Sequence, residues 1–209
     1  MKKLLHIIAT PRGEASRTLK VSGVFLAELR KKYPGCTVDT INVSTETLPP
    51  LTVKRIDGKF ALLMGGDLEG EAARAWKDII THIERFLAAE TYLISTPMWN
   101  FGIPYALKHY IDVVVQPKYL FRYSENGPEG LLKNKKMVVI TSRGGDYGPD
   151  SPARTYDLQE PYLRAVFGFV GITDITFINA QPMDALGPEV ERKAIAQAQE
   201  AARRLAETW

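Results

Sequence analysis

Residues 4–13 read Leu4-Leu5-His6-Ile7-Ile8-Ala9 and then Thr10-Pro11-Arg12-Gly13, and this stretch decides the fold class. The apolar run is too short for a helix and is closed by proline and glycine, so it predicts a buried β-strand. Beyond it, Val21, Phe25 and Leu29 recur at a spacing of four until Pro34-Gly35 ends the pattern, which predicts an amphipathic helix. A strand that leads directly into a helix is the repeating unit of an α/β fold.

Strands and helices alternate along the rest of the chain. The middle strands are continuously apolar, as in a parallel sheet that helices cover on both faces. We therefore expect an open, doubly wound α/β fold, a three-layer sandwich with a five-stranded parallel sheet. Residues 43–67 have a mixed pattern, which we interpret as a surface excursion with a short helix near residues 60–64. The other strands are expected at 37–41, 92–97, 137–142 and 172–178, and the helices at 19–32, 72–87, 104–114, 158–169 and 188–206.

The composition is that of an ordinary globular protein. The chain has 209 residues, of which 27 are basic and 24 acidic, and this length predicts one domain over residues 1–209. No basic run argues for a nucleic-acid partner. The single cysteine, Cys36, excludes an internal disulfide, and no Cys/His cluster has metal-ligand spacing, so we expect no metal. Apolar stretches are too short for a membrane span and no signal-peptide cleavage site follows the first residues, so the expected location is the cytoplasm.

Three loops should carry the chemistry, because ligands of such a sheet bind outside the C-terminal ends of its strands. The first loop, residues 10–18, offers three hydroxyls, two arginines and the start of a helix, whose free N–H groups attract an anion. It therefore predicts a phosphate site, and it matches neither the dinucleotide fingerprint nor the P-loop. The alternative is that Ser16 or Thr18 only caps the helix.

The other two loops favour a flat ligand. Residues 96–104 place Trp99 and Phe101 at a strand end, although aromatic side chains more often serve a core or an interface. Residues 141–148 place Gly144 and Gly145 directly after a strand, where backbone N–H groups can approach a ligand unless the glycines form a plain turn. A phosphate site beside two such loops indicates a mononucleotide. FMN is the main candidate for this fold, and adenine mononucleotides stay open.

At these loops the sequence resembles the FMN-dependent NADH azoreductases, which are dimeric flavodoxin-like NAD(P)H:quinone reductases. The resemblance covers residues 10–18, 97–101, 121–131, 141–145 and 168–174, and so most of the chain. It implies a flavodoxin-like fold, FMN as cofactor and NADH or NADPH as electron donor. It also implies two-electron reduction of quinones and azo compounds by a ping-pong mechanism, in a homodimer with FMN at the subunit interface.

The resemblance also implies roles for individual residues. The first loop would hold the FMN phosphate, the second would pack along the isoalloxazine, and the third would hydrogen-bond its pyrimidine side and stabilise the reduced ring. No catalytic side chain is assigned, because FMN carries the hydride chemistry. Tyr119 and Tyr123 are candidates for the substrate pocket. The expected cofactor-binding residues are Thr10, Ser16, Arg17, Thr18, Pro97, Met98, Trp99, Asn100, Phe101, Ser142, Arg143, Gly144 and Gly145.

The chain departs from the family pattern at a few positions, and other functions stay open. Residues 115–120 replace a segment that in relatives reads close to Arg-Ala-Gly, which affects the expected acceptor more than the cofactor. Thr10 and Trp99 stand where relatives commonly have Ser and Tyr. The alternatives are a flavodoxin-type electron carrier, a non-catalytic FMN-binding protein, and a phosphate-binding hydrolase that uses Glu14 or Asp146.

Overall fold

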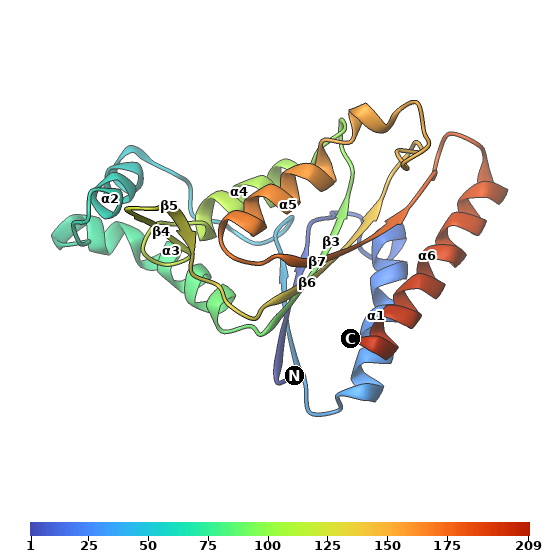
Figure 1. Ribbon diagram of the computed structural model, residues 1–209, viewed down its shortest axis with the longest axis horizontal. Helices are drawn as coiled ribbons and strands as arrows, with labels where there is room; N and C mark the ends of the chain where they lie inside the picture. The colour runs from blue at the N-terminus through green and yellow to red at the C-terminus, as the bar shows by residue number, and fades with distance from the viewer.

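The computed structural model describes all 209 residues, and at its centre lies a five-stranded, wholly parallel sheet (Figure 1). The strand order is β2-β1-β3-β6-β7, so the chain first builds outward on one side of β1 and then continues on the other. The predicted open, doubly wound α/β fold with five parallel strands is confirmed. The strands are β1 (Lys3–Ile8), β2 (Thr37–Asn42), β3 (Thr91–Pro97), β6 (Lys136–Ser142) and β7 (Asp174–Ala180).

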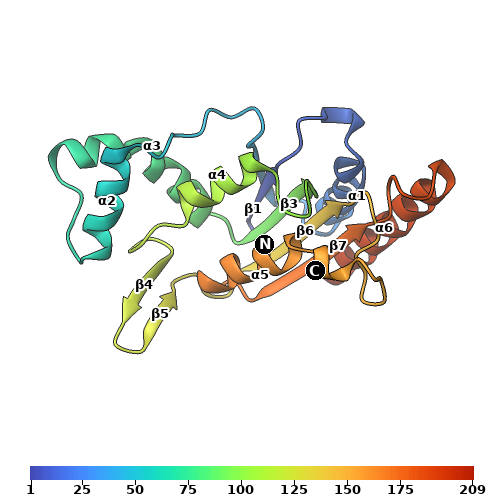
Figure 2. The same ribbon diagram turned by 90° about the horizontal axis from the view of Figure 1, so that it is seen from above.

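Helices cover both faces of the sheet, which gives three layers (Figures 1 and 2). One face carries α1 and α6, which also pack against each other, and the opposite face carries α3, α4 and α5. Helix α2 packs mainly on α3. None of the helices combines the length and the apolar character needed to cross a membrane. The helices are α1 (Arg17–Lys32), α2 (Val53–Leu63), α3 (Gly70–Leu87), α4 (Tyr105–Val114), α5 (Gln159–Phe169) and α6 (Pro188–Thr208).

Successive residues of the inner strands bury their side chains on opposite faces of the sheet. Leu93 and Val138 belong to the core beneath α1 and α6, while their neighbours Ile94 and Val139 belong to the core beneath α3, α4 and α5. All four side chains are fully buried, and each such burial contributes about 1.5–3 kcal/mol. This two-sided burial explains why the strands are continuous apolar runs in the sequence.

Helix α2 is the largest departure from the predicted boundaries. The prediction of a short helix near residues 60–64 is wrong at its N-terminal end, because the helix begins at Val53. Only Gly58 and Leu62 are buried in it, so the apolar pattern is too weak to mark the helix. Gly58 allows α2 to lie directly on α3, since a Cβ there would come within 2.3 Å of the Trp76 indole nitrogen.

A two-stranded sheet was not predicted. Strand β4 (Phe121–Ser124) pairs antiparallel with β5 (Gly127–Gly130), and this hairpin projects from the rest of the chain near α5 (Figure 2). The dipeptide Asn126-Gly127 at its turn is a hairpin signal. Each strand has only four residues, however, so neither forms an apolar run. Strand β7 also begins and ends two residues later than predicted.

The segment that departs from the family pattern joins two distant parts of the chain. Lys118 has a left-handed backbone with φ of +66°. Its ammonium group donates hydrogen bonds to the carbonyl oxygens of Gly65 and Gly66 and to the carboxylate of Asp67. Lys118 thereby ties the loop after α2 to the segment that enters β4.

His6 should make the stability of the fold depend on pH. His6 is 5% exposed, with Nε2 2.8 Å from Ser95 Oγ. Burial, together with the charge of Arg30, lowers the pKa of His6 to about 4. The unfolded chain binds this proton at a higher pH than the folded chain, so stability is full above the unfolded pKa and is lost as the pH falls. We expect the free energy of unfolding to drop by about 2 kcal/mol from about pH 7 to about pH 5.

Urea unfolding at a series of pH values measures this effect. His6→Gln keeps a polar group beside Ser95 but cannot titrate, so it should flatten this part of the profile. Identical pH profiles for the two proteins would contradict the assignment to His6.

Candidate functional site

The C-terminal ends of four strands meet at one edge of the sheet. The register pairs Pro97 with Ser142 and Ser142 with Ala180, and β1 ends beside Ser95. The loops that follow these strands therefore lie side by side, and between them is a cleft. The cleft is lined by Thr10, Arg12, Ser16, Arg17, Pro97, Met98, Trp99, Ser142, Arg143, Gly144, Met183 and Asp184.

The first loop ends at the N-terminus of α1. Ser16 caps the helix, because its buried Oγ accepts the N–H of Leu19. The backbone N–H groups of Arg17 and Thr18 make no hydrogen bond within the chain, so they remain free at the positive end of the helix dipole. Thr18 Oγ1 also lies 2.7 Å from Ser142 Oγ, which joins this loop to the end of β6. Helix capping by Ser16 and an anion site are therefore compatible.

The two arginines of the first loop differ in their charge environment. Arg17 contacts Asp184 Oδ1 and Glu191 Oε1, each at 2.6 Å. Burial opposes the charged form, but the hydrogen bonds and charges of these two carboxylates raise the pKa of Arg17. Arg12 lines the same cleft and makes no ion pair. Arg12 is therefore the cation that is available to an anionic ligand.

The second loop contains a tight two-residue turn. Trp99 and Gly102 exchange backbone hydrogen bonds of 3.0 and 2.9 Å, and between them Asn100 and Phe101 have φ of +47° and +69°. Asparagine tolerates this left-handed backbone, but a bulky residue such as phenylalanine does so at a cost, so the turn stores strain. Trp99 lines the cleft, whereas the Phe101 ring stacks on Tyr156 with 5.1 Å between ring centroids.

The third loop supplies free backbone donors and is held by the loop after β7. The N–H groups of Gly144 and Gly145 make no hydrogen bond within the chain. The carbonyl oxygen of Gly144 accepts the backbone N–H groups of residues 183–185. A Cβ at position 144 would come within 3.2 Å of the Asp184 carboxylate, so glycine permits this close approach.

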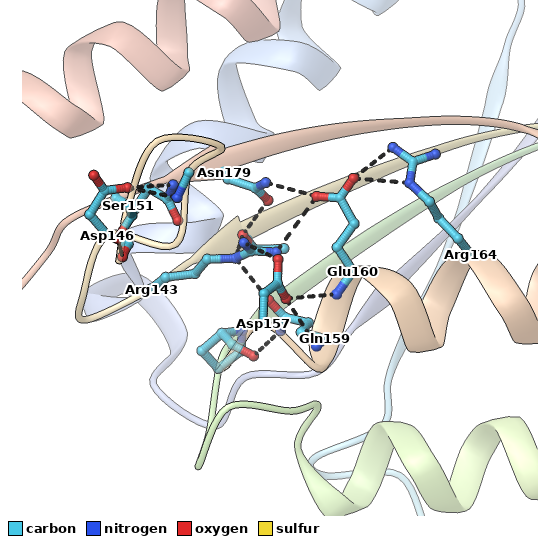
Figure 3. A network of polar contacts seen from close by, with 12 residues as sticks. Arg143, Asp146, Ser151, Asp157, Gln159, Glu160, Arg164 and Asn179 are labelled. Atoms are coloured by element: carbon cyan, nitrogen blue, oxygen red, sulfur yellow. Dashed lines mark hydrogen bonds and ion pairs between the residues drawn. The ribbon is translucent and has the colours of Figure 1, made fainter. Parts of the chain in front are cut away.

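Arg143 directs its side chain into a buried polar network (Figure 3). The side chain is 1% exposed and donates hydrogen bonds to Gln159 Oε1 and Asp157 Oδ2. Gln159 in turn donates to the carbonyl oxygen of Pro97 at 2.8 Å. Because the side chain turns into this network and the backbone N–H donates to the carbonyl oxygen of Ala180, Arg143 offers no free backbone donor to a ligand in the cleft.

The structure brings most of the expected cofactor-binding residues to this cleft and leaves some outside its lining. Asn100 lines an adjoining, mostly apolar hollow, which it shares with Trp99 and Tyr105. Phe101 turns toward Tyr156, as described above. The expected residues outside the lining are Thr18, Asn100, Phe101 and Gly145.

The two tyrosines expected in the substrate pocket lie elsewhere in the chain. Tyr119 is half-buried against the hydrophobic core, and Tyr123 is 63% exposed on the β4–β5 hairpin. Neither lines the cleft, and the hairpin lies away from the C-terminal edge of the sheet (Figure 1).

Sequence reasoning missed three residues that line the cleft. Arg12 was recognised as part of the first loop but was not among the expected binding residues. Met183 and Asp184 follow β7, whose C-terminal end also lies at the ligand edge. The prediction ended this strand two residues too early and left its loop out. The rule that ligands bind at the C-terminal strand ends would have selected that loop as well.

The cleft offers donors and apolar surface but no free pair of carboxylates. Glu14 and Asp146 lie outside its lining, and Asp146 accepts hydrogen bonds from the Gly148 N–H and the Gln181 side chain. The one lining carboxylate, Asp184, is paired with Arg17. The residues proposed for a hydrolase are therefore not arranged for general acid–base catalysis.

Comparisons with known proteins find relatives of the same length. A family model described as a flavodoxin-like fold matches residues 2–206. An FMN-dependent NADH:quinone oxidoreductase of Nitratidesulfovibrio vulgaris is 35% identical over 206 residues, 99% of each chain. FMN-dependent NADH:quinone oxidoreductase 2 of Trichormus variabilis is 38% identical over 210 residues, 100% of each chain. The crystal structure of an FMN-dependent NADH-azoreductase from Bacillus anthracis in complex with FMN is similar with a TM-score of 0.85 and 32% identity, covering 99% of this chain and 100% of that one.

Proposed function

We propose that this chain, which belongs to the FMN-dependent NADH:quinone oxidoreductase family of the flavodoxin-like fold, transfers two electrons from NADH to quinones and to azo compounds. With a quinone, NADH and one proton are consumed, the nicotinamide is oxidised to NAD⁺, and the quinone is reduced to a hydroquinone. One observation carries the proposal. A single cleft combines free backbone donors at the start of α1, the unpaired Arg12, and the apolar side chains of Met98 and Trp99.

The FMN phosphate fits the donor set at the start of α1. We assign it to the hydroxyls of Thr10 and Ser16 and to the free N–H groups of Arg17 and Thr18. The positive end of the helix dipole favours an anion at this place, and Arg12 adds a full positive charge. Arg17 contributes its backbone, because two carboxylates already occupy its guanidinium.

The flavin ring fits between the second and third loops. We assign its apolar contacts to Met98 and Trp99, and its polar pyrimidine side to the N–H groups of Gly144 and Gly145. Bound FMN would supply the redox chemistry by accepting hydride from NADH and then reducing the acceptor, which predicts ping-pong kinetics. Backbone donors fixed at the pyrimidine side stabilise negative charge there without having to reorganise.

We further propose a homodimer that closes around the cleft. Large apolar side chains are exposed around the second loop, and the adjoining hollow is mostly apolar, as is typical of subunit interfaces. Tyr119 and Tyr123 take part in the substrate pocket only across such an interface, since neither lines the cleft of its own chain. The exposed residues in question are Trp99, Phe101, Tyr105, Tyr156 and Leu158.

Two further assignments follow from the same proposal. Both helical layers pack on one sheet, which supports a single flavodoxin-like domain over residues 1–209. NADH is an intracellular electron donor, which supports a cytoplasmic site of action.

Visible absorption spectra test the proposed function directly. We expect the apoprotein to bind FMN, the blue-light absorption to bleach when NADH is added without oxygen, and the absorption to return when a benzoquinone is added. Binding without bleaching would point to a carrier or a non-catalytic flavin-binding protein. Failure to bind FMN would overturn the proposal.

A further inference from the structure

The strained turn of the second loop is contacted by a short segment of the chain at residues 158–159. The N–H of Leu158 donates to the carbonyl oxygen of Phe101 at 3.0 Å. The side-chain amide of Gln159 donates to the carbonyl oxygen of Pro97 at 2.8 Å. Residues 158–159 therefore hold both ends of residues 97–101. Gln159 itself is fully buried and does not line the cleft.

The second partner of Gln159 fixes the orientation of its amide. Its Oε1 accepts from the Nε of Arg143 at 3.2 Å, and an arginine side chain can only donate. The amide nitrogen must therefore face away from Arg143 and toward the Pro97 carbonyl. Because Gln159 is shielded from solvent, water cannot replace either contact.

Arg143 is held in turn by the start of α5. Its Nη1 lies 2.8 Å from Asp157 Oδ2, and Asp157 Oδ1 accepts the backbone N–H groups of Gln159 and Glu160. The N–H of Arg143 donates to the carbonyl oxygen of Ala180. The network thus connects the ends of β6, β7 and β3 with the start of α5.

We propose that Gln159 is a positioning residue that holds the second loop in the conformation required by the flavin ring. Asn100 and Phe101 keep their left-handed backbone only where surrounding contacts impose it, so the hydrogen bond to Pro97 is part of what maintains the turn. Loss of this bond weakens the hold on Met98 and Trp99 beside the ring, which then depends on the hydrogen bond from the Met98 N–H to the Ser142 carbonyl oxygen and on the pair between Trp99 and Gly102. The role toward the flavin rests on the proposed function, whereas the hold on the loop does not depend on FMN.

Gln159→Glu is the sharpest test, because it inverts one contact and keeps the other. The new carboxylate still accepts from Arg143, but it offers the Pro97 carbonyl an acceptor where a donor stood. We expect backbone hydrogen exchange in residues 97–104 of the apoprotein to become at least about tenfold faster, and the FMN Kd to rise about tenfold or more. The absorption spectrum of the FMN-saturated variant should shift, since the surroundings of the ring change.

Gln199→Glu is a matched control. Gln199 also donates from its side chain to a backbone carbonyl, that of Lys20, but on the exposed surface of α6. This variant should leave the exchange, the Kd and the spectrum unchanged. If Gln159→Glu does not fold, Gln159→Met removes the donor to Pro97 together with the acceptor of Arg143 and adds no charge, and the same results are expected of it.

The outcomes separate this inference from the proposed function. Unchanged exchange in residues 97–104 would overturn the positioning role. Faster exchange with an unchanged Kd and spectrum would overturn its role toward the flavin. If the unmodified protein bound no FMN, the proposed function would fail, and the exchange measurement would still decide whether Gln159 holds the loop.

Discussion

Arg143→Met is expected to lower the free energy of unfolding of the apoprotein by about 3–5 kcal/mol. The substitution removes the positive charge that lies 2.8 Å from Asp157 Oδ2, where the arginine is 1% exposed and the aspartate 13%. It also removes a donor from Gln159. A shielded carboxylate without its partner is costly, and the apolar packing of methionine does not offset that cost. Urea unfolding measures the difference.

Two further variants make this prediction specific to the buried pair. Arg204→Met removes an arginine that is 75% exposed and pairs with Glu200 on the surface of α6, so it should cost less than about 1 kcal/mol. Adding Asp157→Asn to Arg143→Met removes the stranded charge, and the double variant should recover part of the stability. A loss below about 1 kcal/mol for Arg143→Met alone would show that the pair does not stabilise the fold.

The strands were predictable because each inner strand is buried on both faces and therefore forms an uninterrupted apolar run. The runs at residues 92–97 and 137–142 match β3 and β6 to within one residue. The β4–β5 hairpin has no such run. A close backbone approach helps to hold it, since a Cβ on Gly130 would come within 2.3 Å of the Gly171 backbone nitrogen. An apolar pattern in the sequence indicates burial only where a whole face of a strand or helix is apolar. A close approach between two backbone segments produces no such pattern.

The site was predictable at the level of loops but not of individual side chains. Parallel strands align their C-terminal ends, and this rule alone selects residues 10–18, 96–104 and 141–148, between which the cleft lies. No local pattern shows that the Arg143 side chain turns inward or that Phe101 stacks on Tyr156. Both arrangements depend on residues 154–159, which reach these loops only in the folded chain.

The second prediction tests the proposed phosphate site by comparing two substitutions at the N-cap residue of α1. Ser16→Asp and Ser16→Asn introduce side chains of nearly equal size, and both residues cap helices well. The two variants therefore share any cost of a larger side chain at this buried position. They differ by one negative charge, placed beside the N–H groups of Arg17 and Thr18 to which we assign the FMN phosphate.

FMN should bind the Ser16→Asp protein about 10³-fold more weakly than the Ser16→Asn protein, because two unit charges about 4 Å apart near a protein surface repel by about 4 kcal/mol. Riboflavin has the same ring and no phosphate, so it should bind both variants equally. Quenching of flavin fluorescence on titration with each apoprotein gives the four Kd values. Equal FMN affinity for the two variants would show that the phosphate does not bind at the start of α1. A parallel loss of riboflavin binding in the aspartate variant would mean that the charge disturbs the fold. The ratio of FMN affinity to riboflavin affinity in each variant is therefore the quantity that identifies a phosphate site.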